Sequence, residues 1–432
     1  MGEKFVKIKE ALNKDKADKE VAIRGWIYRK REHKKKIFLE IRDSSGVIQT
    51  VASKDDKEVF KKAGEITIES SLKLKGKVRE DDRAPGGFEI DISDIEIVGL
   101  ADVFPIGEDK SKELLLDNRH LWLRSQKMTA SMKIRHTVIG AIHEFFRERD
   151  YYEFDPPILT PTACEGTMTL FKVKYFDDIM YLTQSWQLYA EAGIFSLEKI
   201  YDVAPTFRAE PSKTSMHISE FWMAEMEAAW MKLDEVTEVA KEEIKFIIKK
   251  VLEKNKEELK ILGRDIAVLE KYAEADYPTI TYTEALDILK KEGMQVKWGK
   301  DLRTKEEQLL GEHFGVPVVV TNYPKEIMAF YKPRDPENPK TALCFDMIAP
   351  EGYREIVGGS ERSTDIEQMK KDLKKEGAGV GDYDWFFDLR KYGSVPHSGY
   401  GVGVERVICW ICGFDDIKNA VTFPRTMKRF EP

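Results

Sequence analysis

The stretch Pro205–Glu227 brings side chains of very different chemistry together along the chain. It reads as two strands joined by a seven-residue loop, PSKTSMH. Because successive side chains of a strand point to opposite faces, each arm presents its chemistry on one face: Arg208 and Glu210 on the first, and Phe221, Glu225 and Glu227 on the second. A guanidinium, an aromatic ring and several carboxylates on one surface could hold phosphate, a flat base and an amino group at once. The alternative is a solvated hairpin, which has little use for a phenylalanine between acids.

A glycine-rich stretch near the C-terminus is the second candidate. Gly399, Gly401 and Gly403 alternate along a predicted strand, and Glu405 and Arg406 open the helix that follows. Such a strand can cradle a phosphate, but a dinucleotide site would also need a further βαβ unit with an acid about 20 residues on, which we do not expect here. We expect the glycines to let a flat ligand lie against the strand, with Arg406 reaching its phosphates.

The cysteines do not indicate a metal or redox site. They are Cys164, Cys344, Cys409 and Cys412, and so few cysteines favour a reducing compartment. Cys409 and Cys412 form a CxxC pattern, but they lie in the apolar helical run RVICWICGF with no second pair nearby. Burial as small apolar side chains is the favoured interpretation.

The composition indicates a folded chain of two or three domains. The 432 residues are 42% hydrophobic and 11% aromatic, which excludes a disordered chain. The net charge of −7 means that any nucleic-acid contact must come from a local basic patch. No apolar run is long enough to span a bilayer, and the N-terminal MGEKFVKIKE lacks the apolar core of a signal peptide. We therefore expect a cytoplasmic protein without membrane contacts.

Residues 1–100 are predicted to form a separate unit. Five strand-like runs rich in β-branched residues are separated by Gly or charged turns, with a helix expected over 55–63. This order is typical of an OB-type β-barrel, which binds single-stranded nucleic acid through aromatic and basic side chains. The basic run 29–36 precedes Phe38, and Gln49 lies on the next strand. A solvated loop is the alternative for such a run, and the neighbouring aromatic favours binding.

A helix and an edge strand are predicted after a hinge. Residues 101–128 show no strand periodicity and are interpreted as the hinge. An amphipathic helix is expected from Thr129 to about Asp150, because apolar side chains recur along one stripe. The extended segment after it contains Pro156 and Pro157, which confine a strand to the edge of a sheet. A helix followed by an edge strand suits a two-fold interface between copies of the chain.

The remaining chain alternates between strands and helices. A hairpin is expected before a helix that opens after Gln184, and the segment 233–262 has the pattern of a charged, mostly solvated helix. Two further strands carry acids at Asp346 and Glu355. The predicted fold class is α+β, with an N-terminal barrel and an antiparallel sheet flanked by helices over 129–432.

Three separated elements resemble, in this order, motifs 1, 2 and 3 of the class II aminoacyl-tRNA synthetases. They are the long helix with its edge strand (129–160), the FRAE…HISEF hairpin (200–230) and GYGVGVER with the helix after it (397–413). The barrel places the resemblance in the aspartyl, asparaginyl and lysyl subgroup, and the compact stretch between motifs 2 and 3 is similar to the archaeal and eukaryotic type. The resemblance implies an ATP-dependent ligase that joins an amino acid to tRNA, forms a homodimer through the element containing Pro157, and reads the anticodon with its barrel.

The resemblance also implies a role in ATP binding for residues of motifs 2 and 3. Arg208 would contact both the α-phosphate and the amino-acid carboxylate, while Glu210 and Phe221 would hold the adenine. His217 and Arg406 would hold the outer phosphates, and Gly403 would be a further ATP-binding residue. Asp346 and Glu355 would bind Mg²⁺. The catalytic residues Arg208, Glu355 and Arg406 would act by positioning and charge stabilisation rather than as general bases.

Other matching residues would bind the amino acid and the tRNA. Glu165 and Gln187 would receive the α-amino group of the substrate. On the barrel, Phe38 would stack on the middle anticodon base, Gln49 would read it, and Arg31 would be a further anticodon contact.

The residues expected around the substrate's side chain favour asparagine over aspartate. Aspartyl enzymes carry a QSPQ-L-Y-K signature whose Lys pairs with the substrate carboxylate, whereas this chain has QSWQLYA with Ala190 in that place. Glu225, where aspartyl enzymes usually have Asp, would accept from the amide NH₂, and Arg362 would donate to the amide oxygen. With Ala190 in place of the lysine and the longer Glu225 in place of Asp, the pocket disfavours a negatively charged substrate such as aspartate. The expected substrates are L-asparagine, ATP and tRNA(Asn).

Several alternatives stay open at this point. An aspartyl enzyme, discriminating or not, would differ in the amino acid that it activates, and a lysyl enzyme is disfavoured because Arg362 would face an ammonium. A relative that amidates aspartate would not need Phe38 and Gln49, and an inactive tRNA-binding paralogue would not need Arg208 together with the other ATP residues. The chain departs from the family's usual residues at Glu165-Gly166-Thr167, Trp186 and Met216, which leaves the loop geometry open.

Overall fold

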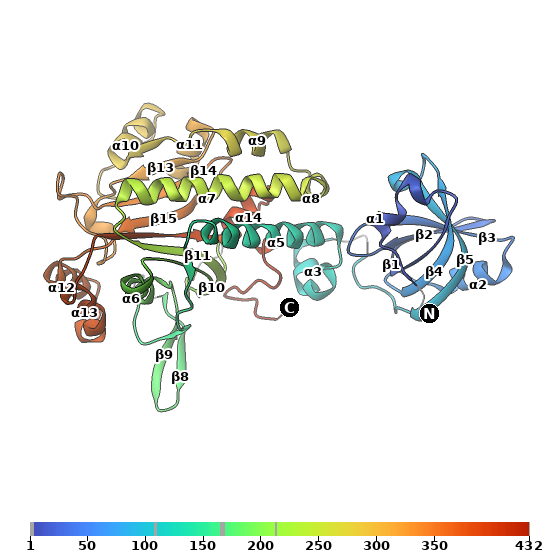
Figure 1. Cartoon of the computed structure of the whole chain (residues 1–432), viewed down its shortest axis with the longest axis horizontal. Coiled ribbons are helices and arrows are strands. Elements are labelled where there is room, and N and C mark those ends of the chain that lie inside the picture. The colour runs from blue at the N-terminus through green and yellow to red at the C-terminus, as the bar shows by residue number, and fades with distance from the viewer. Residues whose placement is uncertain (1–3, 108–109, 165–168, 212–213, 432) are drawn as a thin grey trace. The chain divides into compact units, whose positions relative to one another are not determined.

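The computed structural model describes residues 4–107, 110–164, 169–211 and 214–431 and divides the chain into two compact units, Met1–Leu115 and Leu116–Pro432 (Figure 1). The first unit is a closed barrel of five strands in the order β1-β2-β3-β5-β4, which confirms the OB-type prediction. The strands are β1 Glu20–Glu32, β2 Lys36–Arg42, β3 Val47–Ser53, β4 Ser71–Glu80 and β5 Phe88–Gly99, and the helices are α1 Ile8–Ala11 and α2 Lys57–Glu65. Asp56 caps α2 by accepting from the backbone N–H groups of Glu58 and Val59.

The second unit is built on an eight-stranded sheet in the order β12-β13-β14-β15-β16-β11-β10-β6. Its strands are β6 Tyr152–Glu153, β10 Lys199–Phe207, β11 Glu220–Ala229, β12 Thr279–Thr281, β13 Val318–Thr321, β14 Cys344–Ala349, β15 Arg354–Glu361 and β16 His397–Gly403. All neighbouring pairs are antiparallel except β12 with β13 and β6 with β10. A second, three-stranded sheet consists of β7 Leu159–Thr160, β8 Lys172–Tyr175 and β9 Asp178–Leu182. The predicted α+β class is confirmed.

Helices of the second unit pack against this sheet and against one another. The long helices α5 and α7 run side by side (Figure 1), and with α14 they share one core in which Ile134, Ile244 and Trp410 are fully buried. The helices are α3 Lys112–Asp117, α4 Arg119–Trp122, α5 Gln126–Arg147, α6 Gln187–Leu197, α7 Leu233–Lys254, α8 Lys256–Leu262, α9 Ile266–Glu274, α10 Tyr282–Lys291, α11 Thr304–Phe314, α12 Ile366–Lys375, α13 Asp384–Lys391 and α14 Val404–Cys412. Cys409 and Cys412 are buried on α14.

The segment expected to be a mostly solvated helix over 233–262 differs from the prediction. It forms two helices, α7 and α8, and one side of α7 is buried in the main core. Val236, Ala240, Ile244, Ile248 and Val251 recur every three or four residues and are fully buried. The many Lys and Glu residues of α7 thus conceal an apolar stripe.

The loop of the 205–227 hairpin is longer than predicted. It spans residues 208–219, so Arg208 and Glu210 lie beyond the end of β10 and not on a strand face. The N–H of Arg208 still donates to the carbonyl of Ser219 at 3.0 Å, but the N–H of Ala209 turns to the carbonyl of Thr169 at 2.8 Å. Pairing with β11 therefore stops at Arg208.

The segment interpreted as a hinge contains α3, α4 and the start of α5, which Ser125 caps by accepting from the N–H of Met128. Arg119 of α4 is almost completely buried, and burial lowers its pKa to about 10. Its guanidinium donates to the carbonyls of Thr422 at 2.7 Å and Lys418 at 2.6 Å, and also to that of Val421. One side chain therefore fixes the C-terminal segment of the second unit. Among the described residues, no helix is both long and apolar enough to cross a membrane.

Replacing Arg119 by methionine should destabilise the second unit. The change keeps most of the buried volume but leaves three carbonyls without their donor, and we expect the free energy of unfolding to fall by about 2–4 kcal/mol. Urea unfolding followed by tryptophan fluorescence measures this change. The control Lys127→Met, at an exposed position of α5, should alter stability by less than about 0.5 kcal/mol. Equal stability of the two variants would contradict the role given to Arg119.

Candidate active site

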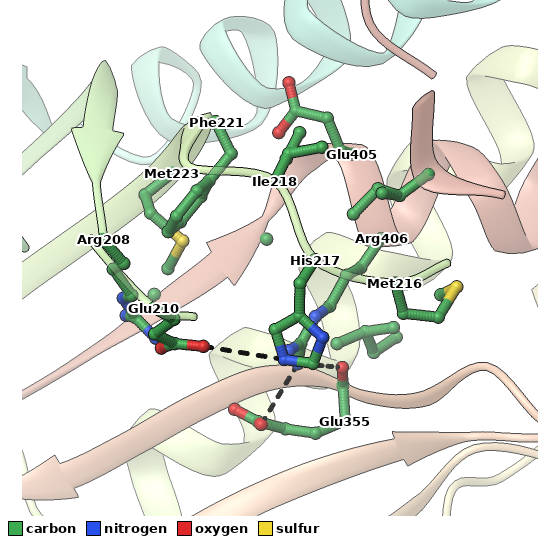
Figure 2. A pocket seen from close by; sticks show the side chains of 14 residues that line it. Arg208, Glu210, Met216, His217, Ile218, Phe221, Met223, Glu355, Glu405 and Arg406 are labelled. Carbon is green, nitrogen blue, oxygen red and sulfur yellow. Dashed lines mark hydrogen bonds and ion pairs between the residues drawn. The ribbon is translucent and has the colours of Figure 1, made fainter. Parts of the chain in front are cut away.

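A cavity that opens to solvent lies where the 208–219 loop meets β11, β15, β16 and α14 (Figure 2). Every residue predicted to bind ATP lines it: Arg208, Glu210, His217, Phe221, Glu355, Gly403 and Arg406. Three segments that are far apart in the sequence therefore meet in one place. Met216, Ile218, Met223 and Ile417 add apolar surface.

One end of the cavity combines a cation with an aromatic ring. The guanidinium carbon of Arg208 lies 5.3 Å from the centre of the Phe221 ring, and Figure 2 shows Phe221 beside Met223. The Glu210 carboxylate lies 3.7 Å from Nε2 of His217. Burial and the neighbouring arginines lower the pKa of His217 although Glu210 raises it, so the ring is neutral at neutral pH. A flat, hydrogen-bonding base fits this end.

The other end holds the Arg406 guanidinium against the Glu355 carboxylate, with the Asp346 carboxylate nearby. Nη1 of Arg406 donates to the backbone carbonyl of Glu355 at 2.8 Å and to its carboxylate at 3.2 Å. Burial alone would raise the pKa of Glu355, but Arg406 and Arg208 lower it. Asp346 is its neighbour, because a methyl group added at Gly358 would lie 3.0 Å from a Glu355 oxygen and 3.4 Å from an Asp346 oxygen. Burial and Glu355 raise the pKa of Asp346 well above its usual range. This end can hold phosphates and a cation.

Glu225 is a residue of β11, and its side chain contacts the start of α6 next to the cavity. Its carboxylate accepts from Oγ of Ser185 at 2.6 Å and from the N–H of Trp186 at 2.8 Å. A side chain at Gly401, which lines the cavity, would lie 3.4 Å from the same carboxylate. Burial and Glu225 raise the pKa of Asp202, its partner in register on β10, to about 7. The space beside Glu225 is therefore acidic in character.

Ala190 and Arg362 are buried and do not line the cavity. Ala190 is fully buried on α6. Arg362 donates from Nε at 2.9 Å and from Nη2 at 2.7 Å to Glu227, and from Nη1 at 2.8 Å to Oγ of Ser360. Burial alone would lower the pKa of Arg362, but Glu227 raises it. The sequence predicted no role for Glu227, because strand alternation predicts the face on which a side chain lies but not the residue that it contacts.

Gly399 leaves the space that the Glu227–Arg362 ion pair occupies. It does not line the cavity, in contrast to the expectation for the three alternating glycines. Any side chain at this position would overlap the carboxylate of Glu227 and would come within 2.6 Å of Nη2 of Arg362. Gly401 and Gly403 line the cavity as expected.

Three further buried residues were missed from the sequence: Glu191 of α6, Arg390 of α13 and His397 of β16. The Glu191 carboxylate accepts from Arg390, accepts from Nε2 of Gln187 at 2.9 Å and lies 3.0 Å from Nε2 of His397. The available signal was the four-residue spacing of Gln187 and Glu191, which places both on one side of a helix. Nothing local to Arg390 or His397 pointed to them.

Two predicted residues cannot be placed in the site. Glu165 lies outside the described residues. Pro157, expected at a dimer interface, lies between β6 and β7, outside both strands, and is exposed.

The three predicted anticodon residues lie together on the barrel. Nη2 of Arg31 donates to Oε1 of Gln49 at 2.7 Å, and its guanidinium carbon lies 5.6 Å from the centre of the Phe38 ring. Nε2 of Gln49 donates at 2.9 Å to Glu89, a buried acid that sequence reasoning missed. This cluster offers a ring for stacking beside oriented polar groups.

Comparisons with known proteins agree with this geometry. The family model "tRNA synthetases class II (D, K and N)" matches residues 111–427, and the model "OB-fold nucleic acid binding domain" matches residues 21–98. The chain is 46% identical over 415 residues to the asparagine–tRNA ligase of Thermococcus kodakarensis, covering 96% of each chain. It is 43% identical to that of Thermoplasma acidophilum, covering 99% of this chain and all of the relative.

The fold is also similar to a solved structure, that of the asparaginyl-tRNA synthetase from Pyrococcus horikoshii complexed with asparaginyl-adenylate. The TM-score is 0.95 at 44% identity, and the match covers 99% of this chain and all of the other. The barrel, the three converging motifs and these similarities lead to one conclusion: the chain belongs to the class II tRNA synthetases of the aspartyl, lysyl and asparaginyl group.

Proposed function

We propose that this protein is an asparagine–tRNA ligase, which activates L-asparagine with ATP to asparaginyl-adenylate and transfers the asparaginyl group to the 3′ end of tRNA(Asn). The observation that carries the proposal is the juxtaposition of the ATP-type cavity with Glu225, while Ala190 stands in place of a lysine. The asparagine–tRNA ligases at 43–47% identity support it.

The cavity suits the activation step without a general base. The amino-acid carboxylate attacks the α-phosphorus in line and expels pyrophosphate, and the terminal ribose hydroxyl of tRNA then attacks the mixed anhydride. Arg208 can bridge the carboxylate and the phosphate with its planar fork, and Arg406 stabilises charge on the outer phosphates. His217 is neutral and donates a hydrogen bond rather than a charge, while Glu210 and Phe221 hold the adenine.

The paired carboxylates of Asp346 and Glu355 fit Mg²⁺ chemically. A hard divalent cation prefers carboxylate and phosphate oxygens, and it would offset the repulsion that raises the pKa of Asp346. When bound there, the ion would neutralise charge on the phosphates. Arg406 holds the Glu355 side chain in place for that role.

The amino-acid end is proposed to select the amide of asparagine. Glu225 would accept from the amide NH₂, and Arg362 would donate to the amide oxygen with N–H groups that Glu227 and Ser360 leave available. Gln187, with Glu165, would receive the α-amino group.

The remaining proposals concern partners and location. We propose that Arg31, Phe38 and Gln49 contact the anticodon of tRNA(Asn), and that the element with Pro157 forms a homodimer interface. Residues 1–100, 101–128 and 129–432 are proposed as anticodon domain, hinge and catalytic domain. The proposed compartment is the cytoplasm.

Arg208→Ala should abolish asparagine-dependent exchange of pyrophosphate into ATP. Arg208 is the proposed contact to both reacting partners, and its loss should lower the exchange rate by about 10³-fold or more. The exposed barrel residue Arg83 provides the control, because Arg83→Ala removes an arginine with its side chain 91% exposed and should leave exchange unchanged. Near-normal exchange in Arg208→Ala would rule out the proposed catalytic site.

Exchange measured separately with asparagine, aspartate and lysine should be strong with asparagine alone. An aspartate carboxylate beside Glu225 is expected to lower kcat/KM by about 10³-fold, because an uncompensated charge in a closed pocket costs several kcal/mol. Comparable exchange with aspartate would identify a non-discriminating enzyme, and exchange with aspartate alone would identify an aspartyl enzyme.

A further inference from the structure

Glu191, Arg390 and His397 form a fully buried cluster next to Gln187, and Glu191 and Arg390 are an ion pair. One oxygen of the Glu191 carboxylate, Oε2, faces Arg390 and His397. The other oxygen, Oε1, accepts from Nε2 of Gln187 at 2.9 Å. The carboxylate thus joins a buried cation to a residue of the proposed substrate site.

This contact determines which way the amide of Gln187 points. An ionised carboxylate can only accept hydrogen bonds, so the amide must turn its NH₂ group toward Glu191. The carbonyl oxygen of Gln187 then points away from Glu191. A carbonyl oxygen accepts from an ammonium, whereas an NH₂ group would repel it.

Arg390 and His397 keep Glu191 in the ionised form that this orientation requires. Burial alone would raise the pKa of Glu191, but Arg390 and His397 lower it below its usual range. Nδ1 of His397 lies 2.8 Å from the carbonyl oxygen of Val395, so both ring nitrogens face oxygen acceptors. The guanidinium of Arg390 is anchored on its other side, where Nε donates to the carbonyl of Ser363 at 3.1 Å.

We propose that Glu191 is a positioning residue, which fixes the amide of Gln187 so that its carbonyl oxygen receives the α-ammonium of the substrate amino acid. This inference rests on the proposed function, since it assumes an amino-acid substrate at Gln187. Recognition of the α-ammonium then depends on Gln187, which touches the substrate, and also on the buried residues Glu191 and Arg390, which do not.

The variant Glu191→Gln should reverse the Gln187 amide. Arg390 donates permanently, so the single carbonyl oxygen of the new side chain must face Arg390. Its NH₂ group then faces Gln187, whose carbonyl oxygen turns inward to accept. An NH₂ group is left facing the substrate's ammonium.

The test compares asparagine with 3-carbamoylpropanoate, which is asparagine without its α-amino group. The KM for asparagine in pyrophosphate exchange should rise by about 10- to 100-fold in Glu191→Gln, the effect of one hydrogen bond to a charged group. The inhibition constant of 3-carbamoylpropanoate and the KM for ATP should change by less than about threefold, because neither ligand contacts Gln187 through an ammonium. An equal loss of affinity for asparagine and for its analogue would show a merely structural role and overturn the proposal.

The control for burial is Glu243→Gln. Glu243 is also a fully buried acid, but it accepts from Tyr400 at 2.6 Å in the helical core. This variant should leave both constants unchanged. A rise in the asparagine KM equal to that of Glu191→Gln would attribute the effect to the loss of any buried acidic side chain and overturn the proposal.

A double variant tests the direction of the amide. Glu191→Gln combined with Gln187→Glu exchanges the two functional groups and keeps the net charge. The amide at position 191 then donates to the carboxylate at position 187, whose second oxygen accepts from the ammonium. The KM for asparagine should return to within about fivefold of the unmodified protein. No recovery would overturn the inference alone, whereas an unmodified protein without asparagine-dependent exchange would overturn the proposed function as well.

Discussion

The buried ion pair of Glu227 and Arg362 is the constraint on which the catalytic sheet depends. Glu227 lies on β11, whereas Arg362 directly follows β15, and β16 runs between these two strands. The pair therefore crosses over β16, at the point where Gly399 is in register with Glu227 on one side and Ser360 on the other. A buried charge without its partner is strongly destabilising. The three strands must consequently keep their register, and the crossing strand must have no side chain at this point.

The same sheet supports two electrostatic environments, which would serve the ATP part and the amino-acid part of the proposed reaction. At the ATP end, Arg406 and Glu355 keep 29% and 39% of their side-chain surfaces exposed, so charged phosphates and a cation can enter and exchange with water. At the amino-acid end, Glu191 and Arg362 are removed from water, and their charges are compensated within the protein. In the proposed function, the first region would bind by charge, whereas the second would bind by the orientation of fixed donors and acceptors.

The sequence was informative where function depends on local spacing. The resemblance to motifs 2 and 3 predicted the residues that line the cavity, and β-branched runs predicted the barrel. Strand alternation wrongly placed Arg208 and Glu210 on a strand face. Reasoning failed where the determinant is a tertiary contact: Ala209 turns to Thr169, which lengthens the hairpin loop. Glu191 and Arg390 are 199 residues apart, so no local pattern could join them. The buried stripe of α7 was hidden because its Lys and Glu residues dominate the composition of the segment.

The preference for a neutral amide follows from the whole balance of buried charge rather than from Ala190 alone. Among the described residues of this region, Arg362 is matched by Glu227, and Arg390 is matched by Glu191. A substrate carboxylate would therefore add a negative charge beside Glu225 to a pocket whose cations already have acidic partners. An amide adds no charge, and in the proposed site its NH₂ group would donate to the Glu225 carboxylate, which would repel aspartate. The single change Ala190→Lys is therefore not enough to make the site prefer aspartate, unless the acidic residues around it are also replaced.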